Sequence, residues 1–415
     1  MPFKAFVVNL ALTFASVLVA LIFIETGLRF TAYRSVLTHY KYPKGYYKNA
    51  PETGFDITPD FPQAIHVLTD LSYPVWSNNL GCFDNDYKNE EPFIYLAGDS
   101  FTWGYAPFKK KFGSIMEEIL STRVLKCGVS GFGTKQEYLK AQTILTRLKF
   151  KPRLIVVGYF IGNDFEDDYT FPNYAVHEGY RVQVRYVKNT TGEITIKENL
   201  KERYKYFSRY CSPKKPKNPA LERGVCLLRR NSVLFNLVKG RIRSLQRRFA
   251  SNESPAAKGP SHFLGPPSSW RERAFPDHFK NIRSFKTLAG EFGTKLLFVL
   301  VHPKDEVYPF LRERGAGFEK QTRLLKEFLD GEKIEYLDLL APFILNADQT
   351  PRRMLNSEKD LYLSNDHHWT ERGDLLAGLE ISRHIVLKEL VPVKEKGKVL
   401  SALERRSKDS FLKTQ

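Results

Sequence analysis

Cysteine is scarce in this chain, which has 4 cysteines among 415 residues and no C-x-x-C pair. That absence argues against a zinc ribbon and against a dithiol redox motif. Cys211 and Cys226 flank a basic, proline-rich stretch and are able to form a disulfide in an oxidising compartment. Cys82 and Cys127 look isolated in the sequence.

Acidic residues are nearly missing from residues 201–250, which hold 15 Lys and Arg against 2 Asp and Glu. Most of the formal net charge of +18 therefore lies in one segment. Such a segment attracts acidic partners, and we expect it to contact anionic lipid or an anionic polymer. No nucleic-acid reader motif accompanies the charge, so we expect no nucleic-acid partner. The alternative is a solvated loop that binds nothing.

Charged residues are also missing from residues 5–24, "AFVVNLALTFASVLVALIFI", a run long enough to cross a bilayer core as a helix. A cleaved signal peptide has a shorter apolar core and an A-x-A-like site, but here the run continues into "ETGLRF". A buried core helix is disfavoured by the terminal position. We therefore expect an uncleaved single-pass membrane anchor, with the rest of the chain exported to a bacterial periplasm or cell envelope. Lys4 precedes the run and Arg29 and Arg34 follow it, so the positive-inside count leaves the orientation open.

Two cofactor motifs are absent as well. The glycine-rich stretch "CGVSGFGTKQ" departs from a phosphate loop, because Thr134 stands between the last glycine and Lys135, and it does not fit the dinucleotide fingerprint. The stretch "DHHW" is a poor metal pattern, because adjacent histidines rarely chelate one ion. We expect neither a cofactor nor a metal site.

What the sequence does contain is an alternation of apolar strands and helices. The pattern predicts strands at 93–97, 124–127, 153–160, 295–301 and 334–339, with helices between them. Runs such as "RLIVVGYF" are typical of strands buried on both faces of a parallel sheet. The fold class is therefore predicted to be α/β, with helices covering both faces of the sheet.

The composition also predicts a division of the chain. The expected parts are a membrane anchor (1–29), an aromatic lead-in region (30–92), the α/β domain (93–164 and 271–395), a basic insertion (165–270) with one helix at 231–249, and a charged tail (396–415).

Polar motifs follow four of the predicted strands. They are Gly98-Asp99-Ser100, a glycine cluster around Gly131, Gly162-Asn163-Asp164, and Asp366-His367-His368. Each motif alone reads as an ordinary turn or helix cap. However, ligand sites in parallel sheets lie at the carboxyl ends of the strands. A serine nucleophile needs a base, a carboxylate that orients the base and donors for an oxyanion, and together the four motifs supply these parts.

In these four blocks, "GDSFTWG", "GVSGFGT", "IGND" and "NDHHW", the sequence resembles the SGNH (GDSL-type) hydrolase family. The resemblance covers roughly residues 93–165 and 290–390. It implies a flavodoxin-like three-layer α/β/α fold, with Ser100 as nucleophile and His368 as base. It also implies an oxyanion hole made by the backbone amides of Ser100 and Gly131 and the side chain of Asn163.

One departure from the family pattern concerns the orienting acid. Many members have an aspartate three residues before the histidine, where this chain has Asn365. The D-x-H-W form is similar to a variant in membrane-associated relatives linked to polysaccharide O-acetylation, and it makes Asp366 the orienter. His367 is a less favoured base, because no acid stands two or three residues before it.

The resemblance implies a serine esterase that acts through a Ser-His-Asp triad on an ester, such as an O-acetylated cell-envelope glycan. Two alternatives stay open from the sequence. One is an O-acyltransferase that moves an acetyl group to a polysaccharide hydroxyl. The other is a non-catalytic binding protein with the same fold.

Overall fold

The computed structural model forms two compact units. The first comprises Met1–Lys41, Val67–Ser72 and Lys201–Gly259, and the second comprises Tyr42–His66, Tyr73–Leu200 and Pro260–Gln415. The described residues are 3–30, 40–68, 71–88, 92–169, 174–177, 179–183, 186–188, 194–196, 221, 224–225, 227–228, 231–250, 269–311, 318–351, 355–356, 358–364 and 366–411.

A five-stranded parallel sheet forms the centre of the second unit. Its strands are β6 (Ile94–Gly98), β7 (Val124–Lys126), β8 (Leu154–Phe160), β13 (Lys295–Val301) and β14 (Glu335–Asp338). They lie in the order β14-β13-β8-β6-β7, which is the flavodoxin-like order. The predicted α/β fold with a parallel sheet is therefore confirmed, and every predicted strand matches an observed one to within one residue at each end.

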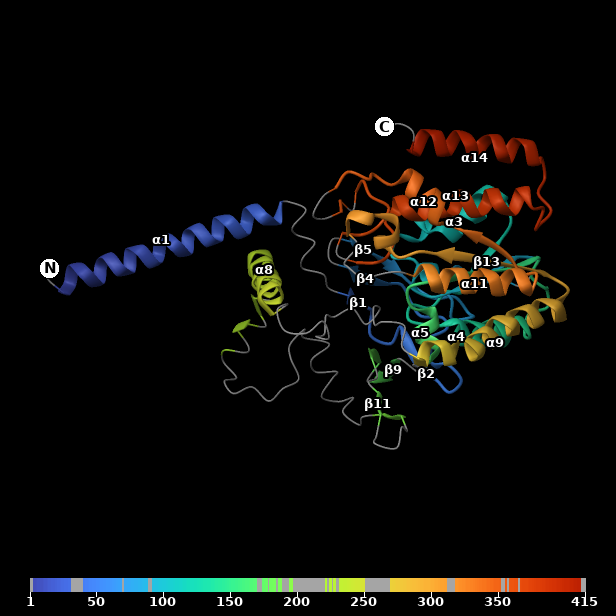
Figure 1. The fold of residues 1–415 in the computed structure, drawn as a ribbon, viewed down its shortest axis with the longest axis horizontal. Coiled ribbons are helices and arrows are strands. Elements are labelled where there is room, and N and C mark those ends of the chain that lie inside the picture. Colours follow the sequence, from blue (N-terminus) through green and yellow to red (C-terminus); the bar gives the residue numbers. More distant parts are fainter. Residues whose placement is uncertain are drawn as a thin grey trace. The chain divides into compact units, whose positions relative to one another are not determined.

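Successive side chains of the sheet enter two separate hydrophobic layers. Ile94 and Leu96 of β6 share one layer with α3 (Phe112–Leu120) and α13 (Glu371–Leu387). Tyr95 and Ala97 share the other layer with α4 (Thr134–Leu145), α9 (Ser269–Phe292) and α11 (Glu319–Gly331). Figure 1 shows the two groups of helices on opposite sides of the strands, which makes three layers. Each fully buried Leu, Ile or Val contributes roughly 1.5–3 kcal/mol, so both faces hold the sheet in place.

Shorter helices and one long helix complete this domain. They are α2 (Ser100–Trp103), α5 (Asp164–Tyr169), α10 (Lys304–Val307), α12 (Leu340–Asn346) and α14 (Lys396–Phe411), with 3₁₀ turns at Phe108–Lys110 and Pro309–Leu311. The charged segment near the C-terminus is thus largely α14, which buries Leu403 and Phe411.

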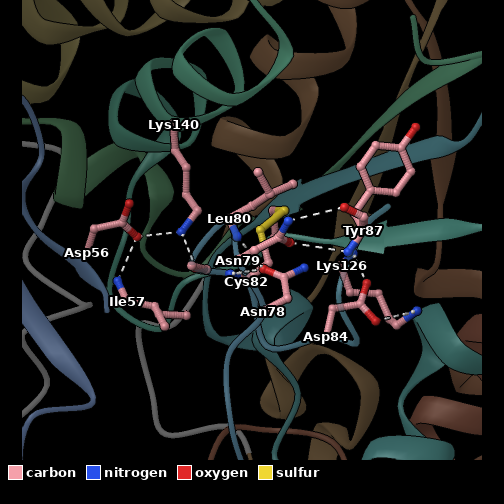
Figure 2. The surroundings of a disulfide bond; sticks show 12 residues. Asp56, Ile57, Asn78, Asn79, Leu80, Cys82, Asp84, Tyr87, Lys126 and Lys140 are labelled. Atoms are coloured by element: carbon pink, nitrogen blue, oxygen red, sulfur yellow. Dashed lines mark hydrogen bonds and ion pairs between the residues drawn. A yellow bond between two sulfur atoms is a disulfide. The ribbon is translucent and has the colours of Figure 1, made fainter. Parts of the chain in front are cut away.

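The structure corrects the sequence-based view of two cysteines. Cys82 and Cys127, which look isolated in the sequence, form a disulfide (Figure 2). Cys127 directly follows β7, the edge strand of the sheet, so the bond ties the lead-in region to that edge. The 45-residue separation concealed the pair, because a disulfide requires closeness in space and not in sequence. The predicted partners Cys211 and Cys226 lie outside the described residues.

Buried ion pairs surround the disulfide, as Figure 2 shows. Asp84 accepts a hydrogen bond from the backbone amide of Lys126 (3.0 Å) and pairs with Lys126 Nζ at 3.3 Å. Lys140 of α4 pairs with Asp56 and donates to the carbonyl of Gly81 at 2.8 Å. These contacts hold the lead-in region against the sheet and α4.

Short antiparallel pairs lie outside the central sheet. In the second unit, β2 (Tyr47–Ala50) pairs with β3 (Gly54–Ile57), β9 (Tyr174–His177) with β10 (Tyr180–Gln183), and β11 (Tyr186–Lys188) with β12 (Ile194–Ile196). The expectation of a single helix between 165 and 270 is therefore wrong, because the segment also contains α5 and two hairpins. Its Lys and Arg content obscured the β-forming Tyr, Val and Ile residues of these hairpins. A further strand, β5, spans Leu71–Val75.

The first unit contains a long apolar helix, α1 (Phe3–Arg29), of which Phe6–Arg29 is long and apolar enough to cross a membrane. The carboxylate of Glu25 accepts hydrogen bonds from the backbone amides of Val233 and Leu234, both at 3.0 Å. It therefore caps the N-terminus of α8 (Val233–Ala250), the helix predicted at 231–249. In the same unit β1 (Tyr40–Lys41) pairs with residues 67–68 of β4 (Ala64–Leu68).

Candidate active site

Ser100 lies at the sharp turn between β6 and α2. Gly98, the last residue of β6, has φ +148°, and a Cβ there would lie 2.0 Å from Thr102 Oγ1, so the turn requires glycine. Asp99 caps α2 by accepting a hydrogen bond from the backbone amide of Phe101 at 2.8 Å. This geometry fixes Ser100 at the carboxyl end of the first strand of the sheet, with 7% of the residue exposed.

Asp366 and His368 form a hydrogen-bonded pair. Nδ1 of His368 bonds to Oδ1 of Asp366, and the same oxygen accepts the backbone amide of His368 at 2.9 Å. Burial raises the pKa of Asp366, but the charge and hydrogen bonds of His368 outweigh it and lower that pKa below its ordinary range. With Nδ1 occupied, Nε2 is the His368 nitrogen left for another partner.

Aromatic contacts bring this pair to the Ser100 turn. The His368 ring lies 5.0 Å from the ring of Phe101 and 4.0 Å from that of Tyr105, measured between centroids. The charge of His368 also acts on the pKa of Asp99, the residue before Ser100. The structure therefore brings Ser100, Asp366 and His368 into one region. His367, the less favoured base, is exposed beside them.

The Ser100 hydroxyl does not donate to His368 in this structure. It donates to Oδ2 of Asp99 at 3.0 Å, and no hydrogen bond joins it to His368 in the described part of the chain. Asp99 is fully buried and next to Ser100 in sequence, and burial raises the pKa of its carboxyl group. Hydroxyl groups rotate to suit their acceptors, and hydrogen bonds of catalytic groups are often long or misaligned without substrate.

The two other predicted oxyanion donors follow β7 and β8. Gly131 has φ +87°, a backbone conformation that favours glycine. Asn163 donates through Nδ2 to Asp167 Oδ2 at 2.8 Å, so one of the two N–H groups of its predicted donor is occupied. Asp167 is four residues later, at the position that a turn of helix brings alongside Asn163.

A group of buried carboxyl groups was not predicted from the sequence. Glu137 of α4 is 2% exposed, and both of its carboxyl oxygens lack a hydrogen-bond partner among the described residues. Burial, together with Asp99, Asp168 and Asp167, raises its pKa well above the ordinary range. Burial raises the pKa of Asp164 in the same way. The raised pKa values favour the protonated forms of these groups. The described residues contain no group of three or more His, Cys, Asp or Glu able to hold a metal ion.

Sequence reasoning also missed a cluster of hydroxyl groups near His368. The hydroxyl of Tyr105 lies 2.5 Å from that of Tyr42 and 3.0 Å from Oγ of Ser130, and Tyr42 donates to Ser130 at 2.9 Å. Ser130 belongs to one of the quoted blocks and Tyr105 directly follows another, but Tyr42 comes from the lead-in region. Only the folded structure reveals that this distant residue joins them.

Comparisons with known proteins give limited information. No family model matches the chain, and no curated protein matches it. Similar solved structures include the acetyl xylan esterase AlAXEase, at 11% identity over 70% of this chain and 98% of that one, with a TM-score of 0.35. A member of the lipolytic G-D-S-L family from Veillonella parvula is 12% identical over 70% of this chain and 96% of that one (TM-score 0.34). A GDSL-like lipase from Bacteroides thetaiotaomicron is 14% identical over 74% of this chain and 91% of that one (TM-score 0.32). Identities and TM-scores this low carry no argument about the activity of this chain.

Proposed function

We propose that this chain is a serine acyl-transfer enzyme in which Ser100 is the nucleophile. His368 takes the Ser100 proton as the hydroxyl attacks an ester carbonyl, and Asp366 orients His368 and stabilises its imidazolium form. The observation that carries the proposal is the hydrogen-bonded Asp366–His368 pair, packed against Phe101 and Tyr105, two aromatic residues that follow Ser100.

The reaction proceeds in two steps. A bond forms between Ser100 Oγ and the carbonyl carbon, the ester C–O bond breaks, and His368 returns the proton to the departing alcohol. A second acceptor then attacks the acyl-enzyme by the reverse sequence, with His368 again as base.

The resting hydrogen bonds must rearrange before attack. Ser100 exchanges Asp99 for His368 as its acceptor, and Asn163 exchanges Asp167 for the oxyanion, which the amides of Ser100 and Gly131 also bind. Burial and the neighbouring Asp99, Asp168 and Glu166 raise the pKa of Asp167 well above its ordinary range. The raised pKa favours the protonated form of Asp167, and this form holds Asn163 less tightly than a carboxylate would, which favours the exchange.

The acceptor distinguishes two forms of the proposal. With water the protein is an esterase, and with a sugar hydroxyl it is an O-acyltransferase; an O-acetylated cell-envelope glycan suits either. Incubating the full chain with an acetylated polysaccharide tests both, because free acetate reports hydrolysis and labelled acetyl on a second glycan reports transfer. Neither product with a folded protein, or products that persist in Ser100→Ala, would contradict the proposal.

We also propose that α1 anchors the chain in a membrane and that the second unit is exported. The disulfide between Cys82 and Cys127 supports export, because disulfides persist mainly in oxidising compartments. We expect the chain to stay in the membrane fraction after carbonate extraction. Release of the chain from the membrane would contradict the anchor. A cytoplasmic location of the second unit, shown by its protection from protease added outside the cytoplasm, would contradict export.

The basic segment is proposed to contact an acidic lipid surface through α8. Apolar residues recur on this helix at 234, 238, 242, 245 and 249, and Arg241 is exposed between them. The side chains of Val238 and Ile242 are about half exposed, and Glu25 of α1 caps the start of the helix. Attraction to acidic lipid should fall as salt rises, whereas salt-independent contact would contradict the proposal.

A further inference from the structure

The hairpin of β9 and β10 carries a partly buried arginine, Arg181, that the proposed reaction does not use. The guanidinium carbon of Arg181 lies within 4.4–5.4 Å of the centroids of four aromatic rings. The rings belong to Tyr42 (4.8 Å), Tyr47 (4.8 Å), Phe55 (5.4 Å) and Tyr174 (4.4 Å). Cation–π contacts of this kind hold the planar guanidinium in one orientation.

Arg181 is adjacent to the candidate active site. It donates through Nη1 to the carbonyl of Ser130, and a Cβ on Gly131 would lie 2.9 Å from the same nitrogen. Tyr42, one of the four aromatic rings that form a cage around Arg181, is hydrogen-bonded to Tyr105, whose ring contacts His368. Arg181 is thus next to the predicted oxyanion donor and two side chains away from the predicted base.

The charge of Arg181 is not balanced within the described residues. No ion pair joins Arg181 to a carboxylate there, and its side-chain hydrogen bonds go to Ser130, at the carbonyl and, from Nη2 at 3.4 Å, at Oγ. Arg181 influences the pKa of Asp167, but burial and neighbouring acids outweigh it and raise that pKa well above its ordinary range, which favours the uncharged form of Asp167. An arginine cannot lose its proton, and a partly buried cation without a counter-charge is costly.

Donors remain available on Arg181. A guanidinium has five N–H groups, and none of the Arg181 nitrogens is among the buried polar atoms that lack a partner. The unused N–H groups therefore face solvent or a ligand. A caged guanidinium with free donors is suited to a carboxylate, which it binds through two parallel hydrogen bonds.

We propose that Arg181 forms a subsite for a carboxylate group of the substrate, so that the preferred ester is carried by an acidic sugar. The inference deepens the proposed function and rests on it, because the carboxylate is assigned to the substrate of that reaction. The carboxylate supplies the counter-charge that Arg181 lacks, and the aromatic rings provide the apolar walls against which a sugar ring packs.

Calorimetry on the full chain in detergent tests the subsite, with glucuronate and glucose as probes. We expect glucuronate to bind the wild type roughly 10- to 100-fold more tightly than glucose, the range for hydrogen bonds to a charged group. Arg181→Gln should abolish that preference, and Arg181→Lys should retain part of it. Arg323→Gln, which removes an exposed arginine on α11, is the matched control and should leave the affinities for both probes unchanged. Equal affinity for the two probes, or an unchanged preference in a folded Arg181→Gln, would overturn the inference.

Kinetics separate this inference from the proposed function. In Arg181→Gln, KM for O-acetylated glucuronate should rise by a larger factor than KM for O-acetylated glucose. If Ser100 proves unreactive but glucuronate binding depends on Arg181, the subsite stands and the proposed chemistry fails. If Ser100 is reactive and glucuronate does not bind, the subsite alone fails.

Discussion

The Asp366–His368 hydrogen bond fixes which nitrogen of His368 carries a proton. In Asp366→Asn the side chain offers an amide or a neutral oxygen to Nδ1, so the ring loses both its orientation and its counter-charge. We expect ester hydrolysis to fall on the order of 10³- to 10⁴-fold without unfolding. Initial rates with 4-nitrophenyl acetate measure this, and Asp330→Asn on an exposed site of α11 is the control. A rate within about twofold of wild type would remove Asp366 from the proposed role.

Gly98 is needed for the turn that presents Ser100. A Cβ at Gly98 would meet Thr102 Oγ1 at 2.0 Å and the carbonyl of Gly158 at 2.9 Å, and φ is positive. Gly98→Ala should therefore lower the free energy of unfolding by roughly 2 kcal/mol or more.

Gly290→Ala provides the matched control for this change. Gly290 lies in α9 with nothing within 4 Å of its Cβ position, so the substitution should stabilise the helix by up to about 1 kcal/mol. Urea unfolding measures both variants. Equal stability of Gly98→Ala and Gly290→Ala would show that the Ser100 turn tolerates a side chain.

At the residue scale the sequence predicts some of the site and not the rest. Ser100 was predicted at the end of a strand and Asp366 was predicted to pair with His368, and the structure has both features. The catalytic roles of these residues stay a prediction. The Asn163–Asp167 bond has a signal in its i, i+4 spacing, yet the predicted oxyanion role concealed it. Arg181 has no signal at all, since its cage is assembled from four segments that meet only on folding.

The ends of β13 and β14 are joined by a histidine with two acidic partners. Nδ1 of His302 lies 2.6 Å from Glu306 Oε2, and Nε2 lies 2.8 Å from Asp338 Oδ1. Burial lowers the pKa of His302, but the hydrogen bonds and charges of Asp338 and Glu306 outweigh it and raise that pKa above 6.5. The folded state therefore binds this proton more tightly than the unfolded state does.

This raised pKa determines how stability should change with pH. The contribution of His302 is fully present below pH 6.5, the unfolded value, and is lost as pH rises through the higher folded value. The difference in free energy of unfolding between wild type and His302→Gln should therefore shrink between pH 6 and 9 by about 1.4 kcal/mol for each unit by which the pKa is raised.

His384→Gln is the control of opposite sign. Burial lowers the pKa of His384 despite the nearby Glu335, so the stability of wild type relative to this variant should increase as pH rises from the lowered folded value to 6.5. Urea titrations at several pH values measure both differences. A pH-independent difference for His302→Gln would contradict the assigned pairing.

Among the elements, strands of the sheet were the most predictable. Their continuous apolar runs reflect burial on both faces, as β8 illustrates with every residue buried. The hairpins β9–β10 and β11–β12 were missed, because short strands outside a core carry no strong hydrophobic pattern. Gly293, with φ +61°, directly follows the last residue of α9.

At the scale of the whole molecule, the Cys82–Cys127 disulfide joins the lead-in region to the sheet. Replacing both cysteines with alanine should lower the free energy of unfolding by about 4 kcal/mol, the loop-entropy value for a closed loop of this size, 45 residues. Thermal unfolding of wild type with and without a reductant gives a matched comparison. Free thiols at both positions in protein purified from its native compartment would contradict both the bond and the proposed export.

The central claim is that Ser100 is an activated nucleophile, and one measurement tests it directly. The full chain is treated with a fluorophosphonate probe and its intact mass is determined beside that of Ser100→Ala and His368→Ala. The account predicts one adduct on the wild type, none on Ser100→Ala and a strongly slowed reaction with His368→Ala. An unlabelled wild type that is folded by circular dichroism, or an adduct that persists in Ser100→Ala, would contradict it.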